Sequence, residues 1–232
     1  MLLFKQYLGD FFALLFPDLC NACNTPLFHG EKQICIQCRY DLPYTDFHLY
    51  ADNIVAKLFW GRIPCHAAMA MLYFRKGSRV QNLVHRLKYK GQTELGFVLG
   101  GLLGERLLAS SFYLPADMII PVPLHPNKER SRGYNQAVLI AQGIASSLQV
   151  PLAIQLLIRN KATGTQTKKN RYSRFENMKS AFVAPDAAAI LGKHIILVDD
   201  VITTGATLEA CGQILLAAGA SKISIVALAY AE

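Results

Sequence analysis

Two adjacent carboxylates and the threonine-rich turn behind them are the residues best suited to chemistry. Asp199 and Asp200 follow the apolar run 194–198, which is typical of a buried strand, and the segment 205–218 has the pattern of a helix. Ligands of open α/β sheets bind at the carboxyl ends of strands, and the N–H groups of a helix start attract phosphate. Carboxylates accept hydrogen bonds and suit the hydroxyls of a sugar or its Mg²⁺ ion. The turn comprises Thr203, Thr204, Gly205, Ala206 and Thr207.

This pattern predicts a site for a phosphorylated sugar. An ordinary helix cap made by Asp200 and Thr203, with Asp199 in solvent, is the simpler alternative. It accounts for one acid and one threonine, but not for two acids and three threonines around a glycine.

Four cysteines form two Cys-x-x-Cys pairs separated by about a dozen residues, the spacing of a tetrahedral sulfur site. Zinc is favoured, and its role would be structural because four protein ligands leave no position for water. Two disulfides or an iron–sulfur cluster are the alternatives. The ligands would be Cys20, Cys23, Cys35 and Cys38, whereas Cys65 and Cys211 are expected to be small buried side chains.

The positive charge of the chain is concentrated in two stretches. The 232 residues carry a formal net charge of +8 although only 17% of them are charged. The stretches 75–90 and 159–179 hold most of the clustered lysines and arginines, which suits a phosphorylated ligand or nucleic acid better than two solvated faces. The candidate nucleic-acid contacts are Arg86, Lys88, Tyr89 and Lys90, although core packing explains Tyr89 equally well.

Alternating strands and helices are expected to position these groups. The hydrophobic content of 52% excludes global disorder, and the length fits one domain with a small appendage. Strand patterns cover 66–74, 117–122, 151–158, 178–184, 194–198 and 222–229, helical patterns cover 78–90, 93–110, 133–149 and 205–218, and 159–177 is expected to be a loop. This order predicts a parallel sheet with helices on both faces. The expected division is a helix and cysteine module over 1–45, a connector over 46–65 and the sheet domain over 66–232.

Residues 1–16 have the spacing of an amphipathic helix, interrupted by Lys5 and Asp10. They lack the basic start and the cleavage site of a signal peptide, and no apolar run is long enough for a membrane span. We therefore expect a cytoplasmic protein in a reducing compartment.

The segment 195–207 resembles the phosphoribosyl pyrophosphate (PRPP) binding signature of type I phosphoribosyltransferases. Segments 87–91, 121–125 and 132–137 are similar to the ComF/GntX-type family, as are the four-cysteine knuckle and the residues Thr163, Gln166, Arg174, Asn177, Ala181 and Phe182. The resemblance covers the chain from about Phe16 to Leu228. It implies a type I phosphoribosyltransferase-like (Rossmann-like) sheet flanked by helices, with a small N-terminal zinc module. Members of this family are associated with DNA uptake during natural transformation.

The resemblance also implies roles for individual residues. Asp199 and Asp200 would hold the ribose hydroxyls, with Mg²⁺ on the substrate, and the turn 203–207 would hold the 5′-phosphate. The pyrophosphate loop would comprise Val122, Pro123, Leu124 and His125, and cis X-Pro bonds are expected there. A mobile basic loop would carry Lys168, Lys169, Arg171 and Arg174, with Lys169 in place of the apolar residue expected at that point.

Two functions follow from these expectations. The first is transfer of phosphoribosyl from PRPP to an undetermined acceptor, with release of pyrophosphate. The second is a non-catalytic PRPP-fold module that binds single-stranded DNA or a partner helicase of the competence machinery. Selection of an acceptor would depend on the cysteine knuckle and on aromatic residues of the connector, for which core or interface packing is the simpler role: Phe47, Tyr50, Phe59 and Trp60.

Overall fold

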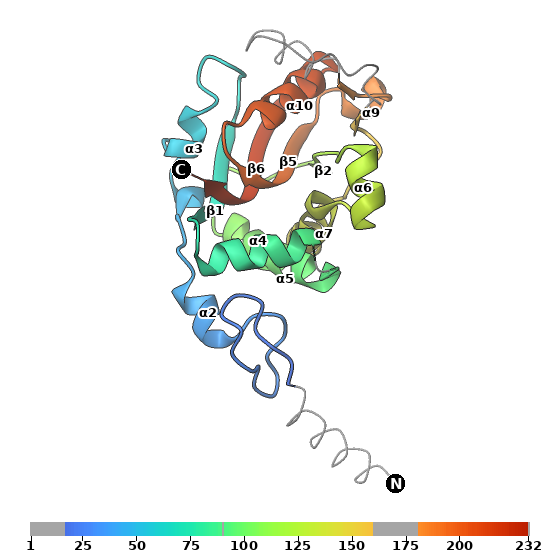
Figure 1. The fold of residues 1–232 in the computed structure, drawn as a ribbon. Helices are drawn as coiled ribbons and strands as arrows, with labels where there is room; N and C mark the ends of the chain where they lie inside the picture. Colours follow the sequence, from blue (N-terminus) through green and yellow to red (C-terminus); the bar gives the residue numbers. More distant parts are fainter. Residues whose placement is uncertain (1–16, 90, 160–180, 232) are drawn as a thin grey trace.

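A four-stranded parallel sheet forms the centre of the molecule (Figure 1). The computed structural model describes residues 17–89, 91–159 and 181–231. The strand order is β1-β6-β5-β2, and every neighbouring pair is parallel. The strands are β1 (Ala67–Phe74), β2 (Met118–Pro121), β5 (His194–Ile202) and β6 (Lys222–Ala231). A separate antiparallel pair comprises β3 (Ile158–Arg159) and β4 (Phe182–Val183).

Helices cover both faces of this sheet, as predicted, because its strands are almost continuously apolar and successive side chains point to opposite faces. In β1, Met69 and Met71 pack on one side and Ala68 and Ala70 on the other. The helices on the methionine side are α4 (Arg79–Tyr89), α5 (Thr93–Leu108) and α7 (Gln136–Leu148). The other face carries α3 (Ile54–Lys57), α9 (Ala187–Ile190) and α10 (Ala206–Ala217).

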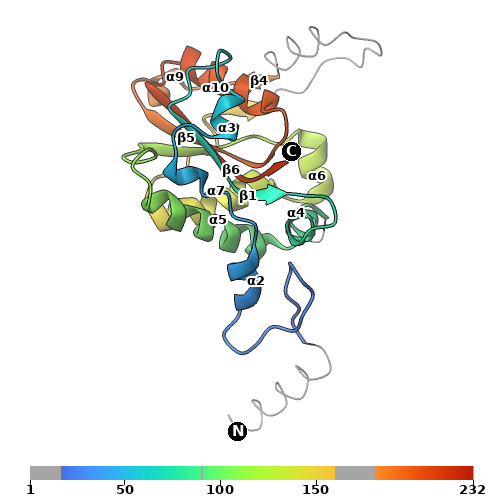
Figure 2. The ribbon, with the colours of Figure 1, turned by 90° about the vertical axis from the view of Figure 1, so that its left-hand side faces the viewer.

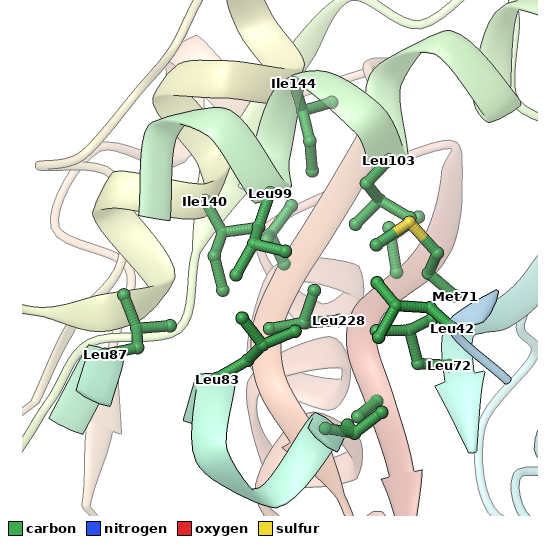
Figure 3. Close-up of a cluster of buried hydrophobic side chains, with 14 of the residues drawn as sticks. Leu42, Met71, Leu72, Leu83, Leu87, Leu99, Leu103, Ile140, Ile144 and Leu228 are labelled. Atoms are coloured by element: carbon green, nitrogen blue, oxygen red, sulfur yellow. The ribbon is translucent and has the colours of Figure 1, made fainter. Parts of the chain in front are cut away.

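The core on the methionine side is built mainly from leucines (Figure 3). Leu83, Leu99 and Leu103 are fully buried between the helices and the sheet. Burial of each such side chain stabilises the fold by about 1.5–3 kcal/mol. The helices α5 and α7 also cross closely, since a Cβ added at Gly100 would lie 2.1 Å from the carbonyl oxygen of Ile140. Only glycine permits this crossing.

The cysteine module lies at one end of the molecule, beside α4 and α5 (Figure 2). It ends in α2 (Ile36–Asp41), and the chain then passes through η1 (Phe47–Leu49) and α3 to reach β1. The connector predicted over 46–65 packs against the sheet: Asn53 Nδ2 donates to the carbonyl of Ala68 in β1 at 2.9 Å, and Phe59 is fully buried. The connector is therefore part of the sheet's packing.

Two expectations about local structure are wrong, and one helix was not predicted. Of the strand predicted over 151–158, only one bridge between Leu152 and Ile119 and the first residue of β3, Ile158, are extended and paired, because the chain turns between them. An additional helix, α6 (Pro126–Arg132), follows the predicted pyrophosphate loop. The expected cis X-Pro bonds of 121–125 are trans, since the one cis peptide among the described residues joins Leu114 to Pro115.

Several predictions concern residues outside the described ranges. These are the helix over 1–16, Lys90 and the basic-loop residues Lys168, Lys169, Arg171 and Arg174. Of the strand predicted over 178–184, the described part contains β4. Among the helices of residues 17–89, 91–159 and 181–231, none has the length and apolar character needed to span a bilayer.

Candidate functional site

The carboxylate doublet lies at the carboxyl end of β5, the central strand next to β6 and β2. Asp199 Oδ1 accepts from the backbone N–H of Asp200 at 2.8 Å, and Asp200 Oδ1 accepts from that of Val201 at 2.7 Å. Both side chains are partly buried. These bonds hold one oxygen of each carboxylate and orient the pair.

Lys88 joins the doublet from α4. Its Nζ lies 2.7 Å from Asp200 Oδ2, in an ion pair whose side chains are 23% and 15% exposed. Burial and the neighbouring Asp200 charge raise the pKa of Asp199 to about 7, although the charge of Lys88 opposes the shift. The ionised fraction of Asp199 therefore changes near neutral pH. Because the ionised carboxylate accepts hydrogen bonds through both oxygens, the number of hydrogen bonds that Asp199 can accept changes in the same range.

The threonine-rich turn lies directly beside the doublet, at the start of α10. Gly205 occupies the position before the helix with a φ of 72°, in the left-handed region that favours glycine. A Cβ added there would lie 3.0 Å from Cε1 and Cζ of Phe59. Residues of the segment 199–208 line a small hollow of about 40 Å³ over the turn. Backbone N–H groups at this helix start suit an anion.

A larger cavity of about 240 Å³ lies next to the doublet. Lys88, Asp199, Asp200 and Thr207 line it together with three residues of the predicted pyrophosphate loop, Val122, Pro123 and Leu124. The fourth, His125, caps α6 instead: its Nδ1 accepts from the backbone N–H of Asn127 at 3.2 Å. The structure thus brings the turn, the doublet, Lys88 and most of the loop to one site.

Five further polar residues line this cavity without having been assigned to the site from the sequence: Lys128, Arg132, Asn135, Gln136 and Arg159. Asn135 caps α7 through the N–H of Ala137 at 3.0 Å, and its Nδ2 donates to the carbonyl of Val122 at 2.9 Å. Arg132 Nη1 donates to Gln136 Oε1 at 2.6 Å. The sequence did contain a signal for Arg132, Asn135 and Gln136: they lie in the segment 132–137, which resembles the ComF/GntX-type family but had been given no role.

Tyr89 is exposed at the rim of this site. Its side chain is 66% exposed, so core packing does not explain it. The Arg132 guanidinium lies 5.3 Å from the centre of its ring, and the His85 ring lies 5.0 Å away. A cation beside an exposed aromatic ring is suited to a flat or anionic ligand.

The four predicted ligand cysteines lie together, with their sulfur atoms all within 4.8 Å of one another: Cys20, Cys23, Cys35 and Cys38. The Sγ atoms of Cys23 and Cys35 are 3.8 Å apart, too far for a disulfide, and the cysteines are free thiols. Zn–S bonds of about 2.3 Å place tetrahedral sulfurs about 3.8 Å apart. The cluster therefore fits zinc. Cys211 is buried as expected, and Cys65 is partly buried.

The cysteine module docks on α4, the helix that carries Lys88. Asn82 Nδ2 donates to the carbonyl of Ala22 at 2.9 Å. Arg86 Nη1 donates to Asn21 Oδ1 at 3.2 Å, and its Nη2 donates to Asn24 Oδ1. Arg86, a candidate nucleic-acid contact, is thus engaged with the module. One helix connects the cysteine cluster to the carboxylate doublet.

Part of the chain matches a known domain family. Residues 135–232 match the phosphoribosyl transferase domain family. A solved glutamine PRPP amidotransferase from B. subtilis has a TM-score of 0.44 at 19% identity, over 62% of this chain and 30% of that one. The matched domain, the parallel sheet and its helices define a phosphoribosyltransferase-like protein with an N-terminal four-cysteine cluster.

Relatives of nearly the same length define the family more closely. DNA utilization protein YhgH of Shigella flexneri is 31% identical over 231 residues, covering 91% of this chain and 96% of the relative. Competence protein F of Haemophilus influenzae is 34% identical over 154 residues, or 64% and 67% of the two chains. The chain belongs to the ComF family, which includes these proteins.

Proposed function

We propose that this protein binds PRPP with Mg²⁺ and transfers its phosphoribosyl group to an acceptor. The observation that carries the proposal is the juxtaposition of the carboxylate doublet, the start of α10 and a cavity bordered by cations. Three cationic side chains border that cavity besides Lys88: Lys128, Arg132 and Arg159. The proposed ligand has a diol and two anionic ends, which match these three features.

Each part of the site would hold one part of the ligand. The carboxylates of Asp199 and Asp200 would accept hydrogen bonds from the ribose hydroxyls, and the N–H groups of 203–207 would bind the 5′-phosphate. The cations would bind the pyrophosphate. Carboxylate oxygens are also donors that Mg²⁺ prefers, so the doublet fits an ion carried by the substrate.

The chain's own residues would lower the barrier mainly by position and charge. The bond between the ribose C1 and the pyrophosphate oxygen breaks, and the acceptor's electron pair forms the new bond to C1. Bound Mg²⁺ would neutralise part of the charge on the pyrophosphate. Lys88, whose Nζ lies at Asp200, would add a positive charge on the side of the pyrophosphate. The carboxylates would stabilise the positive charge that develops on the ribose.

The test is calorimetric titration of the protein with PRPP and Mg²⁺. Wild type is expected to bind, and Asp200→Asn is expected to weaken binding at least tenfold. Asp52→Asn is a matched control, because Asp52 is a surface acid that pairs with Lys57 at 3.0 Å and does not line the cavity. Wild type that does not bind, or Asp200→Asn that binds equally well, would refute the proposal. Transfer is then tested by release of pyrophosphate with each candidate nucleobase or amine.

Binding of single-stranded DNA is a second candidate, favoured by the exposed ring of Tyr89 beside Arg132. Bases stack on such rings, while arginine and lysine side chains bind the phosphates. DNA affinity should then fall steeply as salt concentration rises and should decrease in Tyr89→Ala, whereas Asp200→Asn should leave it unchanged. An affinity that is insensitive to salt would exclude this candidate. For both functions we propose a reducing compartment such as the cytoplasm, where four thiols stay available to a metal.

A further inference from the structure

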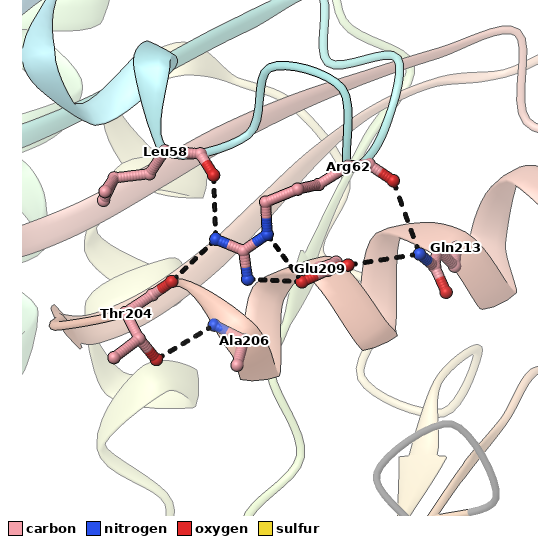
Figure 4. Close-up of polar contacts among 6 residues, drawn as sticks. All are labelled: Leu58, Arg62, Thr204, Ala206, Glu209 and Gln213. Carbon is pink, nitrogen blue, oxygen red and sulfur yellow. Dashed lines mark hydrogen bonds and ion pairs between the residues drawn. The ribbon is translucent and has the colours of Figure 1, made fainter. Parts of the chain in front are cut away.

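Arg62 connects the segment before β1 with the turn that begins α10, across 142 residues of sequence (Figure 4). Its Nη1 donates to the carbonyl of Thr204 and to that of Leu58, each at 2.8 Å. Its Nε donates to Glu209 Oε2 at 2.8 Å, and its Nη2 forms an ion pair with the same oxygen. One guanidinium therefore contacts the turn, the helix and the connector together.

Glu209 is unusual because it is an acidic residue at a buried position. It lies in the first turn of α10 and is only 3% exposed, so its charge is almost completely removed from water. Such a burial is costly unless a cation and hydrogen bonds compensate it. Arg62 supplies the cation, and Gln213 Nε2 lies 3.4 Å from Glu209 Oε1. The Arg62 side chain forms its ion pair with Glu209 although it is itself 32% exposed.

The same acid would disturb an anion site if it were unpaired. A carboxylate one helical turn beyond the N–H groups of residues 205–207 would repel a phosphate bound to them. The paired guanidinium cancels that charge. It also holds the carbonyl of Thr204, which fixes the peptide that leads into Gly205.

Packing adds to this restraint. The ring of Phe59, three residues before Arg62, lies directly under Gly205, where a Cβ would be 3.0 Å from two of its carbons. The turn is thus supported from below by a buried ring and tied at one side by a guanidinium. Both groups come from the connector 46–65.

We propose that Arg62 is a positioning residue for the phosphate-binding turn: with Glu209 it holds the N–H groups of 203–207 in the shape that binds the 5′-phosphate. The proposal rests on the function proposed above and extends it by making the connector part of the ligand site. Arg62 need not touch the ligand for this role.

Two probes separate this role from a general structural one. Ribose 5-phosphate reports on the turn, and inorganic pyrophosphate with Mg²⁺ reports on the cation-lined cavity. Arg62→Met is expected to weaken ribose 5-phosphate binding at least tenfold while pyrophosphate affinity stays within about twofold of wild type. Arg106→Met is the matched control: Arg106 pairs with Asp46 at 3.1 Å on the surface of α5, away from the turn, and both affinities should be unchanged.

Two further variants cover the case in which Arg62→Met does not fold. Arg62→Lys keeps the charge but cannot reach Thr204 and Glu209 together with the same geometry, so it should weaken ribose 5-phosphate binding selectively. Glu209→Gln weakens the contact that holds Arg62 at the turn, so it should also reduce ribose 5-phosphate affinity while pyrophosphate affinity stays within about twofold of wild type. Equal loss of both ligands in each Arg62 variant, or no loss of either, would overturn the role of Arg62. Wild type that binds neither probe would instead refute the proposed function.

Discussion

Substitution of Gly205 by alanine tests whether the turn before α10 is as tightly built as its geometry indicates. The residue has a φ of 72°, and a Cβ on it would lie 3.0 Å from two ring carbons of Phe59. That ring is fully buried, so it cannot move into solvent. The added methyl group must therefore displace either the ring or the turn.

The expected loss of stability has two parts. A left-handed conformation costs alanine about 1–2 kcal/mol relative to glycine, partly offset by about 0.4–1 kcal/mol from the stiffer unfolded chain. Forcing a methyl group against a packed ring costs about 1–3 kcal/mol more. Gly205→Ala should therefore lower the free energy of unfolding by about 2–4 kcal/mol.

Gly192→Ala is a matched control, because Gly192 has a φ of 73° and no atom within 4 Å of its Cβ position. Urea denaturation followed by circular dichroism should show that the control loses only the conformational part, about 1 kcal/mol. Phe59→Leu in the Gly205→Ala background should recover part of the difference. Equal losses for the two glycine variants, within about 0.5 kcal/mol, would refute the close packing of the ring under the turn.

Two further outcomes are expected. The folded protein holds a proton on Asp199 up to a pKa of about 7, whereas an ordinary aspartate carboxyl in the unfolded chain releases it near 3.8, so the stability of the ligand-free protein should fall as pH rises from about 4 to 7. Asp199→Asn should flatten this slope in denaturant titrations at pH 5 and pH 8. Removal of zinc by a chelator should abolish hydrogen-exchange protection in α2 and reduce it in α4, which the module contacts through Asn82 and Arg86, while β5 stays protected.

Either of two results would contradict these predictions. A slope that Asp199→Asn leaves unchanged would mean that another group binds the proton. Protection in α4 that survives chelation would mean that the helix does not depend on the cysteine module. Metal analysis of the untreated protein is the control, since the purified chain should contain one zinc ion for each set of four cysteines.

The periodicity of the sequence was sufficient to predict the main elements of the fold. Residues 194–198 predicted a strand and 205–218 a helix from their apolar patterns, and the structure has β5 over His194–Ile202 and α10 over Ala206–Ala217. The helix α6 was missed because its residues 126–132 have no apolar face, and none of them is buried. The bridge at Leu152 was overpredicted as a strand, because a short apolar run does not distinguish one pairing contact from a whole ladder.

The site was predictable where it is local in sequence and not where it depends on folding. Asp199, Asp200 and the turn behind them adjoin each other in the chain, so their chemistry could be inferred directly. The pairing of Lys88 with Asp200 and that of Arg62 with Glu209 join residues more than a hundred positions apart, and no spacing rule relates them. Phe59 matched the expectation of core packing for the connector aromatics, while Trp60 is 61% exposed.

The close crossing of α5 and α7 has a consequence for the tolerance of this family to sequence change. Gly100 and Gly143 bring two backbones within contact distance, and the first residues of α7, from Asn135 onward, border the cavity. A larger side chain at the crossing must separate the two helices, and a shift of α7 would move Asn135 and Gln136, which line the cavity. A substitution at either glycine would therefore alter the cavity, although neither residue lines it.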